Sequence, residues 1–468
     1  MSDELVTIHD ASTEQLFEIN EITQEFELKI DKLRKIQNYF MKQLKIGLEK
    51  DGQNLSMVPS FVTSVPTGNE IGTYLTLDLG GTNLRVCKVI LEGGGKIHII
   101  EGQLYEISED LKTGDITVLF DFIADCVENL LSKEWGDSIQ KNDKIDLGFT
   151  FSFPIIQTAI NKGTLLKWTK GFTCTGAVGN DIVSILQESF NRKSLPVKVT
   201  ALINDTVGTA LAHAYSHPKV ILGAILGTGT NGAYFERLEN IKKLNHNFDS
   251  SDKMIINIEW GAFDSEKVIL PITQYDNKLD KESNNPNSQI FEKLISGMYL
   301  GEITRNILLH LIDRSLLFNG LSSKSLNQHY AFETKYMSII ESDNTETLEN
   351  TKQILENLFH ISITNLTDRQ IVKRICQLVG IRASRLSSIA LASIISYCKM
   401  EGNECCIGID GSLFEKYPNF SIRIYNTLKE FFGENADKIG LHYTCNGSSV
   451  GAALAAFSAN QSKSKFKL

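Results

Sequence analysis

The chain has 468 residues, of which 42% are hydrophobic and 22% are charged. These proportions are close to the globular average, so composition excludes a disordered, collagen-like or coiled-coil protein, and the length predicts up to about three domain-sized units. The formal net charge of −9 disfavours non-specific binding to nucleic acid or to anionic membranes, so we expect neither as a partner.

The N-terminal stretch MSDELVTIHDASTEQ contains acids and no apolar core, and the sequence has no run of 18 or more apolar residues. We therefore expect a cytoplasmic protein. The eight cysteines form no CxxC pair, a spacing that predicts reduced and mostly buried thiols and disfavours a disulfide or zinc framework.

The first predicted element is a long amphipathic helix over residues 12–50. Ser12 and Gln15 have the spacing of a capping box, and apolar residues recur at helical intervals until Asp51-Gly52. A strand over 74–79, a tight turn at 80–83 and a strand over 84–91 then predict a hairpin. The run Gly93-Gly94-Gly95-Lys96 lacks the spacing of a phosphate-binding P-loop, so it predicts another hairpin turn.

The remainder of the chain alternates between strand and helix patterns, which predicts an α/β fold. Polar stretches at 239–253 and 276–289 predict surface loops. Strands are expected at 145–151, 197–203, 220–226, 254–260 and 405–409, and helices at 118–132, 181–190, 206–215, 289–312, 369–400 and 449–459.

Two segments of similar sequence, LGGTN at 79–83 and LGTGTN at 226–231, each follow an apolar strand. The similarity indicates two related halves with a cleft between them. Turns of Gly, Thr and Asn expose backbone N–H groups and hydroxyls to phosphate oxygens. Taken alone, each turn is typical of a plain hairpin; together with Asp78, which could hold Mg²⁺ through water, they favour a phosphate site.

A further candidate is Asp205, which follows the predicted strand over 197–203 and begins a predicted helix. A carboxylate at that position is either a routine N-cap or a functional acid. Ser152 and the pair Thr169 and Lys170 follow other strand patterns, and they add hydroxyl and ammonium groups suited to a polyhydroxylated ligand and a transferring phosphate.

These segments together resemble the eukaryotic hexokinases over residues 12–460, and MIINIEWGAFD and SGMYLGEITRN are most similar to fungal glucokinases. The resemblance implies an actin-like ATPase (ribonuclease H-like) fold with a sugar and ATP cleft between two lobes. It implies a small lobe over 68–205, completed by a C-terminal helix at about 447–460, and a large lobe over 206–446 on which the helix 12–50 packs. The motifs that support it are LDLGGTNLRV (77–86), LGFTFSFP through WTKGF (147–172), LINDTVGT (202–209), ILGTGTNGAY (225–234), IEWGAFD (258–264), FEKLISGMYLGE (291–302) and GIDGSLFEKYP (408–418).

The resemblance also implies ATP-dependent phosphorylation of a hexose at its 6-hydroxyl, with Asp205 as general base and Lys170 beside the γ-phosphate. Asp78 would hold Mg²⁺ through water. The sugar-binding residues would be Ser152, Thr169, Lys170, Asn204, Asp205, Asn231, Glu259 and Glu292. The nucleotide-binding residues would be Asp78, Gly80, Gly81, Thr82, Asn83, Thr228, Gly229, Thr334, Ser338, Gly411 and Ser412.

One segment departs from the family pattern. The usual Asp-Gly-Ser-Gly-x-Gly is replaced here by Asn446-Gly447-Ser448-Ser449-Val450-Gly451. Three activities therefore remain open: a glucose-directed kinase, a broad hexokinase that also uses mannose, fructose and N-acetylglucosamine, and a weakly catalytic sugar sensor. A chaperone-like or actin-like ATPase is disfavoured because those proteins need no LGFTFSFP or WTKGF segment. We expect a monomer or a homodimer that binds glucose and MgATP.

Overall fold

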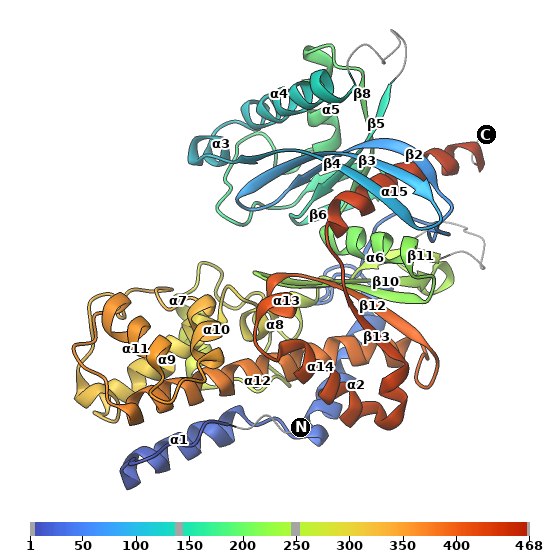
Figure 1. The fold of residues 1–468 in the computed structure, drawn as a ribbon. Coiled ribbons are helices and arrows are strands. Elements are labelled where there is room, and N and C mark those ends of the chain that lie inside the picture. Colours follow the sequence, from blue (N-terminus) through green and yellow to red (C-terminus); the bar gives the residue numbers. More distant parts are fainter. Residues whose placement is uncertain (1–4, 136–143, 245–252, 466–468) are drawn as a thin grey trace.

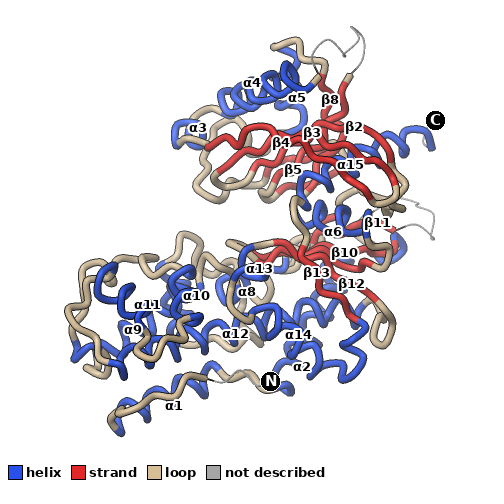
Figure 2. The backbone as a smooth tube through the Cα atoms, in the orientation of Figure 1, coloured by secondary structure: helices blue, strands red, loops and turns tan. Residues whose placement is uncertain are grey.

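The computed structural model describes residues 5–135, 144–244 and 253–465, and within them the chain forms two lobes, each built on its own sheet (Figure 1). The sheet of the upper lobe has the strand order β4-β3-β2-β5-β8, and that of the lower lobe has the order β1-β11-β10-β9-β12-β13 (Figure 2). The strands are β1 (Val58–Pro59), β2 (Ile71–Leu79), β3 (Asn83–Gly93), β4 (Lys96–Glu106), β5 (Ile145–Phe151), β8 (Val197–Ile203), β9 (Val220–Leu226), β10 (Thr230–Arg237), β11 (Lys253–Asn257), β12 (Cys405–Asp410) and β13 (Ile439–Tyr443), with β6 (Ile155–Ala159) and β7 (Lys162–Leu165) forming a separate ribbon.

The two sheets repeat one arrangement of strands. In the upper lobe the antiparallel strands β4, β3 and β2 are followed by β5 and β8, which are parallel to β2. In the lower lobe β11, β10 and β9 are antiparallel, and β12 and β13 are parallel to β9. This repetition agrees with the expectation of two related halves. It places the turns at 80–82 and 227–229 at equivalent positions in the two sheets.

Helices cover the outer face of each sheet, and α6 (Asp205–Ser216) and α15 (Gly447–Lys465) lie between the lobes (Figure 1). Side chains alternate along a strand, so each inner strand faces two cores. Leu75 and Leu77 of β2 pack in the core beneath α4 and α5, whereas Tyr74 packs in a second core with α6 and α15. The other helices are α3 (Glu109–Thr113), α4 (Ile116–Glu134) and α5 (Ile182–Arg192) in the upper lobe, and α1 (Thr13–Phe26), α2 (Ile30–Glu49), α7 (Gln274–Glu282), α8 (Ile290–Ile295), α9 (Leu300–Asp313), α10 (Thr334–Ser342), α11 (Glu349–Gln353), α12 (Leu366–Tyr397), α13 (Ser412–Lys416) and α14 (Phe420–Phe432) in the lower lobe.

The lower lobe surrounds α12, the central helix of its core. Among the described residues, α12 is the one helix long and apolar enough to span a membrane by length and composition, but 89% of that window is buried inside the protein. Helices α1 and α2 contribute side chains to the same core. The last strand of the upper sheet, β8, ends just before residue 205, where the sequence predicts the boundary between the lobes. The boundary as a division into domains stays a prediction.

The predicted helix over 12–50 is wrong in one respect, because it is two helices. α1 ends at Phe26 and α2 begins at Ile30, with extended backbone at Glu27 and Lys29. Phe26 and Leu28 are both buried, and two residues apart they could not face the same core on one helix. The backbone carbonyl of Leu28 also accepts a hydrogen bond from Arg385 Nε at 2.9 Å. The break therefore buries Leu28.

The predicted helix over 289–312 is also two helices, α8 and α9. The connection between them supplies hydrogen bonds to the turn after β9, since Gly297 N donates to the Gly227 carbonyl (2.8 Å) and Met298 N donates to the Thr228 carbonyl (3.1 Å). The predicted strand over 254–260 ends earlier, at Asn257, because Glu259 adopts a left-handed conformation with φ 58°. Both corrections concern segments that face the cleft.

The polar stretch 276–289, predicted as a surface loop, instead begins within helix α7. Its acids form buried ion pairs: Asp276 accepts two bonds of 2.7 Å from Arg382, and Asp280 accepts from Lys293 at 2.7 Å and from Lys267 at 2.8 Å. Charged residues that find partners can be buried, and polarity alone does not predict this. Of the other polar stretch, 239–253, residues 245–252 lie outside the described residues.

Helices α6 and α15 cross in direct backbone contact between the lobes. A Cβ on Gly451 of α15 would lie 2.2 Å from the Cα and carbonyl oxygen of Gly208 in α6. A Cβ on Gly148 of β5 would lie 2.1 Å from the Ala452 carbonyl oxygen. These glycines let α15 lie against both α6 and the upper sheet.

Gly451→Ala is expected to lower the free energy of unfolding by about 1–3 kcal/mol, because the added methyl group meets backbone that cannot rotate away. The better helix propensity of alanine offsets at most about 1 kcal/mol of that loss. Urea denaturation measures the change. The comparison variant is Gly380→Ala in α12, whose methyl group meets the Tyr417 hydroxyl, which donates to Glu341 at 2.9 Å, so it compares a side-chain clash with a backbone clash. An equal or higher urea midpoint for Gly451→Ala would contradict the prediction.

Candidate active site

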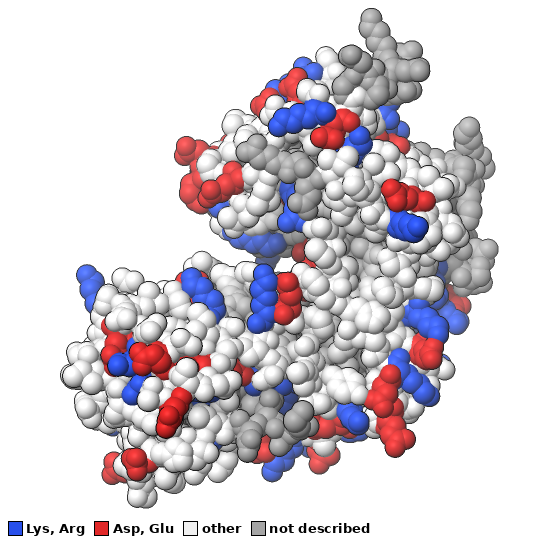
Figure 3. Space-filling model, in the orientation of Figure 1, with Lys and Arg blue, Asp and Glu red and all other residues white. Residues whose placement is uncertain are grey.

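The two lobes enclose a cleft that opens on one side of the molecule, with basic side chains along its upper wall (Figure 3). One part of it is a cavity of about 520 Å³ lined by the turn after β2 and by the ends of β12 and β13. The polar residues of that lining include Asp78, Gly80, Gly81, Thr82, Asn83, Arg85, Asp410, Asn446 and Ser448. All four residues of the predicted turn, 80–83, thus line the cavity.

Asp205 is the first residue of α6 and directly follows the C-terminal end of β8, as the sequence predicts. Asn204 caps the helix, because its Oδ1 accepts from Thr206 N (3.0 Å) and from the Thr206 hydroxyl (2.7 Å). The N-capping role therefore belongs to Asn204. Asp205 Oδ1 accepts from Thr206 N at 2.8 Å, and its side chain is only partly buried. Its second carboxylate oxygen has no partner among the described hydrogen bonds.

On the lower lobe, Asn231 and Glu259 belong to one hydrogen-bonded network with Asn257, a residue that the sequence analysis missed. Glu259 Oε1 accepts from Asn257 Nδ2 (2.7 Å) and Asn231 Nδ2 (3.1 Å), and Asn231 Oδ1 accepts from Glu259 N (3.0 Å). Asn257 Oδ1 reaches the Thr206 hydroxyl at 3.4 Å. Asn257 therefore connects this network to the helix that begins with Asp205.

Glu292 approaches the same cleft from α8. Its Oε2 accepts from Thr230 N at 3.0 Å and would lie 2.9 Å from a Cβ on Gly229, so the predicted Gly229 is required for this contact. Gln289, three residues earlier, has a buried Oε1 that finds no hydrogen-bond partner among the described residues and lies next to Gly261. Gln289, with this unpaired acceptor beside Glu292, is a second residue that the sequence did not indicate.

Several acids of the cleft influence one another electrostatically. Burial raises the pKa of Glu259 and of Glu292, and the Asp205 carboxylate raises both further while Lys170 opposes this. Burial raises the pKa of Asp78 to about 6, and Asp205 again adds to the shift. Four predicted acids from both lobes therefore share one electrostatic environment. Such clusters of raised pKa values are typical of functional sites.

Lys170 is the cation of this environment. Its Nζ donates to the Ser152 carbonyl at 2.8 Å and lies 5.4 Å from the ring centroid of Phe153. Its side chain passes Gly81, where a Cβ would lie 3.1 Å from Lys170 Cβ. The Thr169 carbonyl accepts from Phe172 N in the same loop. The structure thus brings Ser152, Thr169 and Lys170 together beside the turn after β2.

Of the predicted nucleotide residues in the lower lobe, Thr228, Gly229 and Gly411 lie at adjacent strand ends, whereas Thr334 and Ser338 lie on α10. A Cβ on Gly411, after β12, would lie 2.4 Å from the Leu226 carbonyl oxygen, so Gly411 packs against the turn that contains Thr228 and Gly229. The Thr334 hydroxyl donates to the Gly297 carbonyl at 2.7 Å and accepts from Gly301 N at 3.0 Å. Thr334 therefore holds the connection between α8 and α9 in place. Ser338 and Ser412 have no hydrogen bonds among those described that would assign them a role.

Residues 446–451, where the sequence differs from the family pattern, leave no buried side-chain nitrogen or oxygen without a hydrogen bond among the described residues. Asn446 Oδ1 accepts from Arg85 at 2.8 Å, and the backbone carbonyl of Ser448 accepts from the Thr150 hydroxyl at 3.0 Å. Ser449 is buried, with its hydroxyl 3.9 Å from Cys87 Sγ. Asn446 thus lines the cavity opposite Asp78 and keeps a contact with Arg85.

Two hexokinase family models match the chain, one over residues 18–215 and the other over residues 221–458. Among curated relatives, a hexokinase of Emericella nidulans is 40% identical over 91% of this chain and 87% of its own length. A glucokinase of Aspergillus niger is 39% identical over 97% of this chain and 99% of its own.

Among solved structures, the glucose complex of a Schistosoma mansoni hexokinase has a TM-score of 0.86 at 36% identity, and the alignment covers 96% of this chain and all of that one. The matches confirm the predicted two-lobed actin-like fold. They agree with the motifs, the repeated sheets and the cluster of acids in the cleft. The chain therefore belongs to the eukaryotic hexokinase family.

Proposed function

We propose that this enzyme transfers the γ-phosphoryl group of ATP to the 6-hydroxyl of glucose. The observation behind the proposal is that several carboxylates and two glycine-containing turns face the same cleft. Asp205, Glu259 and Glu292 influence one another electrostatically. The turn after β2 lines the cavity of the cleft, and Gly229 in the turn after β9 lies against the Glu292 carboxylate. Carboxylates and amides pair with vicinal hydroxyls, and exposed backbone N–H groups pair with phosphate oxygens.

In this mechanism Asp205 accepts the proton of the 6-hydroxyl as that oxygen attacks the γ-phosphorus and the bond to ADP breaks. The unpaired carboxylate oxygen of Asp205 is available for this proton, since the other accepts from Thr206 N. Lys170 would face the transferring phosphate, because its side chain lies beside Gly81. Asn231, Glu259 and Glu292 would orient the sugar, and positioning is the largest contribution a protein makes to phosphoryl transfer.

The residues also fit Mg²⁺, which we propose as the cofactor that accompanies ATP. Burial and the Asp205 charge raise the pKa of Asp78, so a cation beside it would relieve unfavourable negative charge. Asp410, which lines the same cavity, likewise has its pKa raised by burial. When bound, Mg²⁺ would neutralise charge on the phosphates during transfer.

The weakly catalytic sensor is not favoured, because Asp205 keeps an unpaired oxygen and Asn446 keeps its Arg85 contact. We propose glucose as the preferred hexose over fructose. Fructose in its furanose form would displace hydroxyls from Glu259 and Glu292 and leave desolvated acceptors unpaired. We also propose a cytoplasmic location and a monomer or homodimer, in keeping with the sequence prediction.

A coupled assay of ADP formation with glucose, mannose, fructose and N-acetylglucosamine tests this proposal. We expect kcat/KM to be highest for glucose and at least about ten-fold lower for fructose, one lost hydrogen-bond partner being worth about that much. Values for glucose and fructose that agree within about three-fold would favour a broad hexokinase. ATP consumption that does not depend on any hexose would contradict the kinase itself.

Glucose is also expected to compact the molecule. Ser152 belongs to the upper lobe, whereas Asn231 and Glu259 belong to the lower lobe, so a sugar bound to both favours the closed arrangement by its additional contacts. Small-angle scattering should show a smaller radius of gyration at saturating glucose. Glycerol at equal concentration is the control for osmotic effects. An unchanged radius with glucose would contradict closure.

A further inference from the structure

A second group of chemically reactive side chains lies at the far end of α6 from Asp205. His213 lies in the last turns of α6, His217 follows the helix as its C-cap, Cys406 belongs to β12 and His442 belongs to β13. His213 is eight residues beyond Asp205, so a helix rise of about 1.5 Å per residue separates them by about 12 Å along the axis. The group is therefore outside the sugar and nucleotide cleft.

The side chains of this group converge closely. His213 Nε2 lies 3.2 Å from His442 Nδ1, and the candidate ligand atoms of His213, His442 and Cys406 all lie within 4.8 Å of one another. The His217 ring stacks on His213 with centroids 4.2 Å apart and lies 4.9 Å from the His442 ring centroid. Two imidazoles and a thiol from three elements therefore converge, and the third imidazole, that of His217, stacks against them.

One separation in this group has the length of an edge of a tetrahedral metal site. With Zn–N bonds of about 2.0–2.1 Å, the edge of such a tetrahedron is about 3.3 Å, close to the observed separation between His213 and His442. His213 Nδ1 lies 3.5 Å from the Thr444 hydroxyl, an outer partner that leaves Nε2 facing the cluster. His213 and His217 also have the i, i+4 spacing that places two histidine ligands on one helix face.

The chemical state of these groups also suits a metal. His213 and Cys406 are both buried, so a metal ion held between them would be largely shielded from water. A bound divalent cation would deprotonate the Cys406 thiol, and the resulting thiolate is a ligand that Zn²⁺ prefers. Within the described residues, no oxygen ligand that would suit Mg²⁺ belongs to this cluster.

We propose that His213, His442 and Cys406 form a binding site for a divalent transition metal, with Zn²⁺ as the expected ion. The exposed His217 ring, turned out of its stack on His213, would supply the fourth ligand. The sequence expectation against zinc rested on cysteine spacing, which does not detect a site built from histidines and one cysteine on α6, β12 and β13. The metal would link the end of α6 to β12 and β13. It would thereby stabilise the native state by an amount that rises with the logarithm of the metal concentration over Kd.

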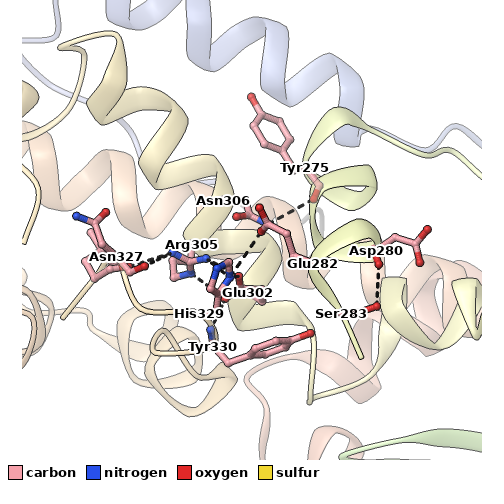
Figure 4. Close-up of polar contacts among 11 residues, drawn as sticks. Tyr275, Asp280, Glu282, Ser283, Glu302, Arg305, Asn306, Asn327, His329 and Tyr330 are labelled. Atoms are coloured by element: carbon pink, nitrogen blue, oxygen red, sulfur yellow. Dashed lines mark hydrogen bonds and ion pairs between the residues drawn. The ribbon is translucent and has the colours of Figure 1, made fainter. Parts of the chain in front are cut away.

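A second cluster of metal-ligand residue types in the described chain, Glu282, Glu302 and His329, does not support the same proposal. Glu302 accepts from Arg305 Nε at 2.8 Å and Arg305 Nη2 at 2.5 Å, and from Tyr330 N at 2.7 Å (Figure 4). Both of its oxygens are therefore already engaged. His329 consequently provides a matched control for a histidine near acids but outside the proposed site.

Titration of the full-length enzyme with Co²⁺ tests the proposal, because a tetrahedral Co²⁺–thiolate site gives intense visible bands and a thiolate charge-transfer band. We expect one equivalent to bind and Zn²⁺ to displace it. Cys406→Ser should abolish the charge-transfer band, and His442→Ala should weaken Co²⁺ binding by more than the 10- to 100-fold typical of losing an outer partner. His329→Asn should change neither band nor affinity.

His217→Asn keeps the test decisive if a buried substitution prevents folding, because His217 is exposed. It should lower Co²⁺ affinity by about 10-fold or more with an unchanged circular dichroism spectrum. The proposal is overturned if the wild-type enzyme shows no charge-transfer band with excess Co²⁺. It is equally overturned if the band persists in folded Cys406→Ser, or if His217→Asn and His329→Asn bind Co²⁺ as the wild type does.

Discussion

Asp205→Ala is expected to lower kcat with glucose by at least about 100-fold, equivalent to about 2.7 kcal/mol of transition-state stabilisation, while glucose affinity stays near that of the wild type. Alanine removes the only carboxylate oxygen that we assign to the 6-hydroxyl proton. The sugar contacts from Asn231, Glu259 and Glu292 remain, since these residues lie on other elements. Steady-state kinetics with ATP, together with glucose binding by calorimetry, measures both quantities.

Asp205→Asn is the matched control for helix structure. Its amide oxygen can still accept from Thr206 N, as Asp205 Oδ1 does at 2.8 Å, but the side chain cannot accept a proton. Both variants should therefore lose turnover to a similar extent. Turnover within a few-fold of wild type in either variant would show that Asp205 is not the base. A large loss in the alanine variant with recovery in the asparagine variant would assign it a positioning role.

Much of the fold could be predicted from local pattern. The hairpin of β2 and β3 pairs Leu79 with Leu84 across the predicted turn, and the Gly93 to Lys96 turn joins β3 to β4 as predicted. Such features depend on neighbours in sequence. The errors occurred where distant contacts decide. The break before Ile30 depends on burying Leu28 in the lower core, and α7 depends on a pairing between Asp276 and Arg382 across 106 residues.

For the site, the sequence indicated which residue types to expect, and the structure adds how they are held. Asn257 has no motif of its own, and its importance appears only because it donates to Glu259 and reaches Thr206. Gln289 is similar, since what distinguishes it is a buried oxygen without a partner among the described residues, and burial can be seen only in the folded structure. The convergence of Asp205 with Glu259 and Glu292 depends on strand order. Sequence spacing does not encode that order.

The raised pKa of Glu259 predicts how both the KM for glucose and the free energy of unfolding change with pH. Burial and the nearby Asp205 charge make Glu259 take up a proton at higher pH than an exposed glutamate. As pH falls through that window, the carboxylate loses an acceptor and the KM for glucose should rise. The raised pKa affects stability in the opposite direction, because the folded state binds the Glu259 proton more tightly than the unfolded state and so gains free energy of unfolding at low pH. This gain is present below the ordinary pKa and is lost as pH rises through the raised one.

Glu259→Gln is expected to lower kcat/KM for glucose by about 10- to 100-fold, the equivalent of about 1–3 kcal/mol. Glu259 Oε1 accepts from the amide groups of Asn231 and Asn257, so the new amide oxygen must take that position to avoid two opposing donors. The new NH₂ group then replaces Oε2, which we assign to a sugar hydroxyl. The loss should be smaller for fructose, because the proposal gives its furanose ring a poorer contact with Glu259.

The matched control is Glu236→Gln on β10, the strand that also contains Asn231. Glu236 is buried and hydrogen-bonded to Asn240 at 2.7 Å, but it belongs to no part of the sugar site, so its substitution should reduce stability without changing the KM for glucose. The rise in KM at low pH should be unchanged in Glu236→Gln and smaller in Glu259→Gln, where Glu292 is the remaining sugar-binding glutamate with a raised pKa. A wild-type KM in Glu259→Gln, or an equal loss with glucose and fructose, would show that Glu259 does not select the sugar. Glucose preference would then have to come from Glu292 or from the shape of the closed cleft.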